Sequence, residues 1–156
     1  MPQTEEEIRK GLIGTWKLIS LVSKPVDSDG PIGYPFGPNA AGYLIYTQEG
    51  YMSAQVMEPG SKPYAKSDPF TASDDEAGEA ARHFLAYSGP FEVFFQDGQS
   101  FVKHSTDLSL VPNWAGGHQL RRVELDGDKL VLSPDRPWEI SVSGTGVDEV
   151  EIASGG

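Results

Sequence analysis

The chain has 156 residues, 38% of them hydrophobic and 22% charged, which suits one folded domain with one core and excludes a disordered chain. Its 23 acidic residues against 12 lysines and arginines give a formal net charge of −11, which disfavours nucleic acid and anionic membranes as partners. The absence of cysteine excludes disulfides, zinc–thiolate sites and thiol nucleophiles.

The N-terminal segment is acidic and polar where a signal peptide would be basic and then apolar, and no run approaches the ~18 apolar residues of a membrane span. We therefore expect a cytoplasmic protein that folds as a single domain over residues 1–156. Thr4 and Glu7 have the spacing of a capping box, which predicts a short helix ending near Gly11.

The first strand and the first long loop come next. The run from Gly14 to Ser23 is rich in β-branched and aromatic residues and predicts a long strand. Residues 25–41 are interrupted by prolines and glycines, which predicts a loop.

The following segment predicts a β-hairpin. Gln48-Glu49-Gly50 suits a three-residue hairpin loop between strands at 42–47 and 51–57. This turn places Tyr46 opposite Met52, so that the two side chains share a face. Which face of the hairpin lies inside stays open, because the alternation of polar and apolar residues is mixed.

A long insertion, residues 58–88, follows the hairpin. Its predicted helix spans Asp74 to Tyr87, where apolar residues from Ala77 to Leu85 recur at helical spacing behind an acidic first turn. An insertion of this length is more typical of a lid than of a passive loop.

The rest of the chain predicts short strands separated by turns. We expect strands at 90–96, 100–111, 117–125 and 130–133, with two further candidates at 138–143 and 147–152. With about nine short strands and one substantial helix, the pattern indicates an all-β antiparallel barrel rather than a parallel α/β sheet.

Register arithmetic predicts which side chains face the interior, because opposite residues share a face of a sheet. A tight turn at Asp97-Gly98 pairs Phe91 with His104. Continuing the alternation along both strands gives the inward residues Phe91, Val93, Phe95, Val102, His104, Thr106, Leu108 and Leu110.

A second hairpin, closed around residues 112–116, places Leu108 opposite Arg121. Arg121 and Gln119 then face inward. A slip of one residue would turn Arg122 inward instead, and this alternative stays open.

An arginine, a histidine, a glutamine and a threonine therefore lie on an otherwise apolar wall. A packed core rarely accepts such groups unpaired, whereas a cavity for a hydrophobic small molecule does. His104 and His118 are placed ~23 Å apart and face opposite ways. Because no metal, phosphate or dinucleotide motif occurs either, we expect no metal and no cofactor.

Five segments form an ordered pattern over residues 11–133: Gly14-Thr15-Trp16-Lys17-Leu18-Ile19-Ser20, Gly42-Tyr43-Leu44-Ile45-Tyr46-Thr47, Gly50-Tyr51-Met52-Ser53-Ala54-Gln55, Ala86-Tyr87-Ser88-Gly89-Pro90-Phe91 and Pro112-Asn113-Trp114. Together they resemble the lipocalin-like domain family of small bacterial and fungal proteins. The resemblance implies a calycin-type barrel with an apolar cavity. Some fungal proteins of this kind act in natural-product pathways as cyclases, isomerases or pericyclases, including hetero-Diels–Alder enzymes.

The candidate catalytic residues are Arg121, His104 and Gln119. Arg121 would clamp a carbonyl, enolate or carboxylate, with His104 or Gln119 as a second group. Structural alternatives stay open: in lipocalin-like barrels an arginine often packs on the first-strand tryptophan, here Trp16, and His104 would serve instead as a satisfied wall residue. The candidate ligand-binding residues are Tyr46, Met52, Phe91, Val93, Phe95, Thr106, Leu108 and Trp114.

The leading hypothesis is a cofactor-independent cyclase, pericyclase or isomerase that acts on a hydrophobic natural-product intermediate. Confinement of the reacting ends would supply up to ~7–11 kcal/mol, and Arg121 would polarise a carbonyl oxygen. The alternative is a non-catalytic carrier of a hydrophobic metabolite. The oligomeric state stays open, with a homodimer among the alternatives.

Overall fold

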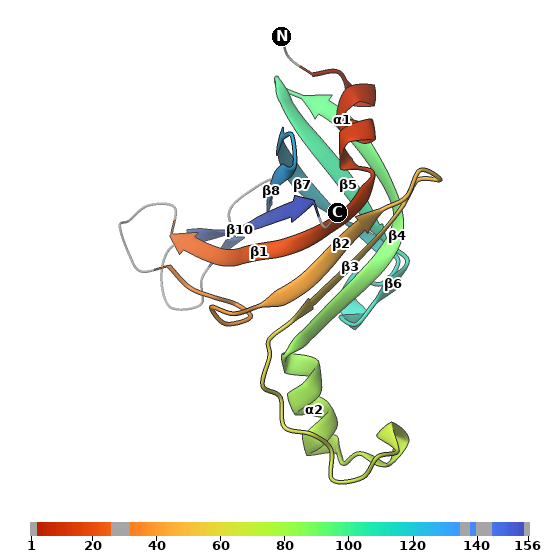
Figure 1. Ribbon diagram of the computed structural model, residues 1–156, viewed down its shortest axis with the longest axis vertical. Helices are drawn as coiled ribbons and strands as arrows, with labels where there is room; N and C mark the ends of the chain where they lie inside the picture. The colour runs from red at the N-terminus through yellow and green to blue at the C-terminus, as the bar shows by residue number, and fades with distance from the viewer. Residues whose placement is uncertain (1–2, 26–31, 135–137, 140–144, 155–156) are drawn as a thin grey trace.

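The computed structural model describes residues 3–25, 32–134, 138–139 and 145–154. The strands of the barrel wall are β1 (Gly14–Pro25), β2 (Ala41–Tyr46), β3 (Tyr51–Met57), β4 (Phe84–Gln96), β5 (Gln99–Thr106), β7 (Gly117–Asp126), β8 (Lys129–Pro134) and β10 (Thr145–Ser154). They pair in this order and antiparallel throughout, and β10 pairs with β1 as well as β8 to close the ring (Figure 1). The all-β antiparallel barrel predicted from the sequence is confirmed.

Short elements complete the described chain. They are α1 (Glu5–Leu12), α2 (Asp74–Arg82), two 3₁₀ turns η1 (Pro69–Thr71) and η2 (Pro112–Trp114), and two short strands β6 (Leu108–Ser109) and β9 (Trp138–Glu139). The predicted strand at 147–152 is part of β10. Of the strand predicted at 138–143, the first two residues form β9, and residues 140–143 lie outside the described residues.

The predicted registers are correct where a short turn joins two strands. Tyr46 lies opposite Met52 across β2 and β3, and Phe91 lies opposite His104 across β4 and β5. The N-terminal helix is also confirmed, because the hydroxyl of Thr4 accepts the backbone N–H at the third helical position.

The helix predicted over residues 74–87 is wrong at its C-terminal end. A capping box at Ser73 starts α2, but the helix ends at Arg82. From Phe84 onward the backbone pairs with β3, so β4 begins there rather than at residue 90. Apolar residues at this point fit both helical spacing and strand alternation, and the pairing with β3 decides between them.

The strand predicted at 100–111 and its register with the next strand are also wrong. β5 ends at Thr106, and the chain turns so that β6 pairs back with β4. Arg121 therefore lies opposite Val102 instead of Leu108. The two registers differ by an even number of residues, so Arg121 keeps its predicted face.

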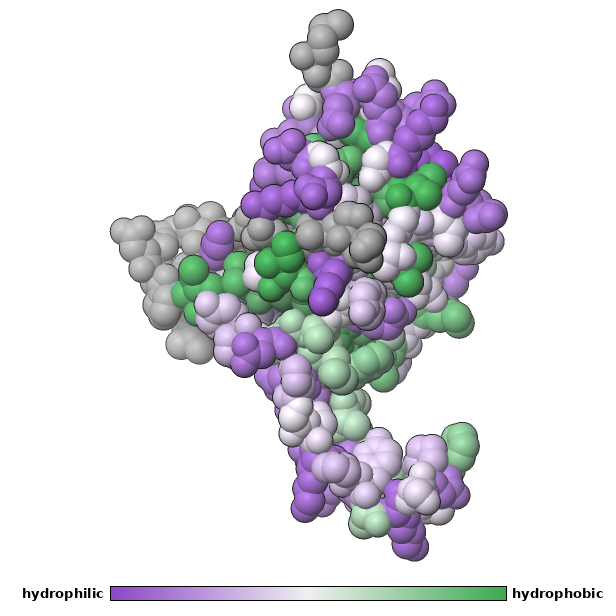
Figure 2. Space-filling view, in the orientation of Figure 1, coloured by the Kyte–Doolittle hydropathy of each residue, from purple (hydrophilic) through white to green (hydrophobic). Residues whose placement is uncertain are grey.

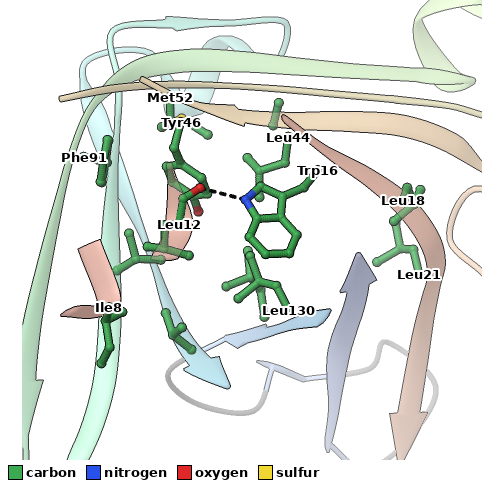
Figure 3. Close-up of a cluster of buried hydrophobic side chains, with 14 residues drawn as sticks. Ile8, Leu12, Trp16, Leu18, Leu21, Leu44, Tyr46, Met52, Phe91 and Leu130 are labelled. Atoms are coloured by element: carbon green, nitrogen blue, oxygen red, sulfur yellow. Dashed lines mark hydrogen bonds between the residues drawn. The ribbon is translucent and has the colours of Figure 1, made fainter. Parts of the chain in front are cut away.

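The helix α1 closes one end of the barrel. Its residues Ile8 and Leu12 are buried in the core, and the indole N–H of Trp16 donates to the Leu12 carbonyl at 2.7 Å (Figure 3). Arg9, also on α1, places its guanidinium carbon 5.3 Å from the centroid of the Phe91 ring. Apolar packing and these two contacts seal this end.

Residues 58–83 form an arm that projects away from the barrel (Figure 1). At its neck, the backbone N–H of Glu58 donates to the His83 carbonyl at 2.8 Å, and His83 Nε2 lies 3.1 Å from Glu58 Oε2. Phe70, on η1, is 95% exposed. The insertion is thus shorter than the predicted 58–88, and in this structure it does not cover the barrel as a lid.

The surface of the molecule is mixed. Figure 2 shows hydrophilic residues over α1 and over most of the arm, with apolar residues exposed between them. Ile45, Tyr51 and Leu108 line an open groove of about 510 Å³ on the outer face of β2, β3 and β6. Neither α1 nor α2 has the length or the apolar composition to cross a bilayer.

Candidate functional site

Two tyrosines lie on either side of His104 inside the barrel. The Oη of Tyr46, on β2, lies 2.6 Å from His104 Nε2, and the Oη of Tyr87, on β4, lies 3.3 Å from Nδ1. Strand alternation turns all three side chains inward, since even-numbered residues of β2 and β5 and odd-numbered residues of β4 share that face. We call these three residues the Tyr–His–Tyr trio.

The trio is uncharged at neutral pH. His104 and Tyr46 are 0% and 1% exposed. Burial, and then the nearby charge of Arg121, lowers the pKa of His104 to about 3. Burial also raises the pKa of Tyr46 and that of Tyr87. The imidazole therefore carries one ring hydrogen, and both tyrosines keep their hydroxyl hydrogens.

Aromatic contacts fix the orientation of the trio. The Tyr46 ring packs edge to face on Phe91, with centroids 4.8 Å apart, and the Tyr87 ring packs edge to face on Trp114 at 5.9 Å. The hydroxyl of Thr106 donates to the Trp114 carbonyl and holds η2 against β5. Trp114 is therefore fixed beside Tyr87.

Arg121 brings a positive charge to this wall. Its Nη1 donates to the Leu120 carbonyl at 2.9 Å, and its Nη2 donates to Gln119 Oε1 at 3.2 Å. Within the described ranges, no acidic side chain forms an ion pair with it. Because a guanidinium has five N–H donors, several remain for a ligand.

In the described part of the chain, Arg121 does not pack on Trp16, and Arg122 does not take its place on the inward face. Trp16 lies at the closed end, and the arginine that stacks on an aromatic ring is Arg9 rather than Arg121. Arg122 lies opposite Phe101, on the other face from Arg121, so the one-residue slip does not occur.

The members of the polar wall differ in exposure. Tyr46 and His104 are fully buried, whereas Tyr87, Gln119 and Arg121 keep part of their surface. β7 runs toward the end covered by α1, because Gly11 lies against Leu125 near the end of that strand, so Gln119 lies farther from that helix than Arg121 does.

The candidate ligand-binding residues are only partly brought together. Met52 and Phe91 are buried in the core, and Val93 lies beside α1. Phe95, at the end of β4, is 42% exposed. Leu108 does not face inward: it is 70% exposed in the outer groove, because β5 ends before it and the inward alternation stops.

Sequence reasoning placed Tyr87 on the helix of the insertion, where it could fold over a ligand, and not on the inward wall. The helical spacing before it assigned this residue to the end of the predicted helix. The signal that would have found it is parity, because Tyr87 and Phe91 are separated by four residues and share a face once β4 is extended backward.

The predicted distance between His104 and His118 is also wrong. His118 lies opposite Ser105, on the outer face and next to Gln119 in the chain, because the register of β5 with β7 differs from the prediction. The two histidines do face opposite ways.

In the described ranges no group of three histidine or acidic side chains lies close enough to hold a metal ion.

Comparison with known proteins gives two matches. Residues 13–150 match a family model described as a lipocalin-like domain, which extends the predicted resemblance from residue 133 into β10. A curated protein of Aspergillus oryzae, the 4'-hydroxy-3'-methoxypropiophenone carrier protein ppsC, is 40% identical over 94 residues. That alignment covers 58% of this chain and 85% of the relative.

Proposed function

This chain belongs to the lipocalin-like domain family, and on that premise we propose that its barrel binds and carries a small hydrophobic molecule through a carbonyl oxygen. The observation that carries this proposal is the half-buried Arg121 on the inward wall, beside Gln119 and the neutral trio. A cation without an acidic partner in the described chain favours an electron-rich oxygen, while the surrounding apolar wall favours a hydrophobic body.

The similar carrier protein supports this ligand class. Its name specifies 4'-hydroxy-3'-methoxypropiophenone, an aromatic ring that bears a ketone. A molecule of that kind combines the two features that the inward wall suits, a flat apolar body and one carbonyl oxygen. We therefore take an aryl ketone as the first ligand to test.

A second candidate function is cofactor-independent cyclisation or isomerisation, including a hetero-Diels–Alder step. Arg121 and Gln119 favour it, because donors that bind a ground-state carbonyl also stabilise charge that develops on that oxygen. Such catalysis would add to binding rather than replace it. A carrier releases its ligand unchanged, whereas a cyclase releases an isomer.

We expect 4'-hydroxy-3'-methoxypropiophenone to bind the purified protein, and Arg121→Gln to weaken binding about 10- to 100-fold, as expected for losing a charged hydrogen bond. Isothermal titration calorimetry measures both. Arg122→Gln is the matched control, since it removes the same charge from the other face. Equal losses in the two variants would contradict the proposal.

Native mass spectrometry of the purified protein separates the two candidate functions. A co-purified small molecule would give the ligand class, and its mass and chromatographic retention after incubation would reveal carrier or isomerase behaviour. The same spectrum gives the oligomeric state and so tests the homodimer.

A further inference from the structure

Tyr46 has one hydrogen-bond partner in the described chain, His104 Nε2, at 2.6 Å. The residue is almost completely buried, so its hydroxyl hydrogen needs an acceptor inside the protein. If Nε2 carried the ring hydrogen, it would donate to Tyr46 and leave that hydroxyl hydrogen without an acceptor, which costs about the full desolvation penalty. Tyr46 therefore donates to Nε2.

This donation fixes the tautomer of His104. The imidazole is neutral and has one ring hydrogen, and Nε2 is occupied as an acceptor. The ring hydrogen consequently lies on Nδ1. From there it points at the Oη of Tyr87, 3.3 Å away.

Tyr87 then accepts from His104 and keeps its own hydroxyl hydrogen free. Unlike Tyr46, Tyr87 is only half-buried, and its ring contacts that of Trp114. Arg121 reaches the same region through Gln119, whose Oε1 accepts from Arg121 Nη2 at 3.2 Å and which lies opposite His104 across β5 and β7. Two free donors, one neutral and one charged, are therefore present in one region of the inward wall.

We infer that the Tyr87 hydroxyl and the Arg121 guanidinium bind one and the same carbonyl oxygen of the ligand, with Tyr46 and His104 as positioning residues that hold Tyr87 as a donor. The inference rests on the proposed function and adds the geometry of recognition. It selects ligands with a planar carbonyl acceptor flanked by apolar surface, and Trp114, whose ring centroid lies 5.9 Å from that of Tyr87, supplies aromatic surface next to that residue.

The first experiment compares two probes that differ at one group. 4'-Hydroxy-3'-methoxypropiophenone has the carbonyl, and 2-methoxy-4-propylphenol has a methylene in its place. We expect Tyr87→Phe to weaken binding of the ketone roughly two- to tenfold, as for one neutral hydrogen bond, and to leave the analogue unchanged. Tyr43→Phe, on the exposed outer face of β2, is the matched control. An equal effect of Tyr87→Phe on both probes would overturn the inference.

The second experiment needs no ligand. Two-bond ¹H–¹⁵N correlation spectra of the wild-type protein report the tautomer of each histidine, and the spectrum of His104→Gln assigns the His104 signals. We expect the Nδ1–H tautomer. The Nε2–H tautomer would overturn the inference, whatever the protein binds. If neither probe binds wild-type protein but the Nδ1–H tautomer is found, the choice of ligand class fails and the donor assignment stands.

Discussion

At the scale of single residues, His104 is a titratable group placed where only its neutral form is tolerated. The ring is fully buried, and both of its nitrogens face tyrosine hydroxyls. Arg121 adds a positive charge nearby. Protonation would therefore place a second positive charge in a dry interior, which costs far more than protonation in water.

We expect this histidine to make the protein less stable in mild acid. The pKa of His104 is about 3 in the folded protein and about 6.5 in the unfolded chain, so between these values the unfolded state binds the extra proton. The contribution of neutral His104 is complete above about pH 6.5 and is lost as the pH falls toward 3. Across this window the free energy of unfolding should fall by up to about 1.4 kcal/mol per pH unit from this group.

Urea unfolding of wild-type protein and of His104→Gln, repeated between pH 6.5 and pH 4, measures this contribution. The variant should show the shallower dependence on pH, because its side chain does not titrate. Parallel curves for the two proteins would mean that His104 is not the group responsible.

The inward or outward direction of most side chains in this site was predictable from strand alternation alone. Arg121, Gln119 and His104 were assigned to the inward face from alternation, and that face survived an error in register because the error was an even number of residues. Tyr87 was not predictable in the same way. Its position depends on the pairing of β4 with β3, a contact between segments separated by the whole arm.

At the scale of elements, the arm is held together by local hydrogen bonds. Glu76 on α2 accepts the backbone N–H of Ser73 at 3.0 Å and that of Ala65 at 2.7 Å, and these bonds lower the pKa of its carboxyl group. Glu79 accepts the backbone N–H of Lys62 at 3.4 Å. These hydrogen bonds join the loop of the arm to α2, and none of them is made with the barrel.

We expect Ser73→Ala to loosen α2 by about 1 kcal/mol, the typical cost of losing an N-cap, without loosening the barrel. Hydrogen exchange of the α2 amides should become faster, while the amides of β3 and β4 keep their rates. Thr4→Ala is the matched control, because it removes the corresponding cap from α1. Faster exchange throughout the barrel in Ser73→Ala would show that the arm and the barrel unfold as one unit.

Strand registers were predicted correctly where a short turn joins two strands and wrongly where a long connection does. Asp97 and Gly98 both adopt positive φ, as a two-residue hairpin turn requires, and this turn set the register of β4 with β5 correctly. The next strand was predicted to continue to residue 111, with a hairpin closed around residues 112–116. The connection from 107 to 116 contains β6, which pairs with β4, and η2, and neither follows from the local sequence.

At the scale of the whole molecule, the two ends of the barrel differ. The packing of Ile8, Leu12 and Trp16 closes one end, and Tyr87 lies on β4 six residues before Val93, which lies beside α1. On the proposed function, substitutions in α1 should lower the free energy of unfolding, whereas substitutions of Tyr87 should change ligand binding.

We expect Leu12→Ala to lower the free energy of unfolding by about 2–5 kcal/mol, since Leu12 is fully buried and its removal leaves a cavity at the closed end. Lys10→Ala, two residues away on the same helix but exposed, should change it by less than about 0.5 kcal/mol. Urea unfolding measures both. A similar midpoint for both variants would mean that α1 does not fold cooperatively with the barrel.

The neck of the arm has a consequence for the engineering and the evolution of the molecule. Its two ends, at Glu58 and His83, leave and re-enter the sheet side by side, bonded to each other. The stability of the barrel therefore depends little on the length of the segment between these two residues, because doubling the length of a loop costs only about 0.6 kcal/mol of closure entropy. A separate module grafted at this position would sit next to a ligand-binding barrel without altering its register, which makes the neck a natural point of attachment for a sensor.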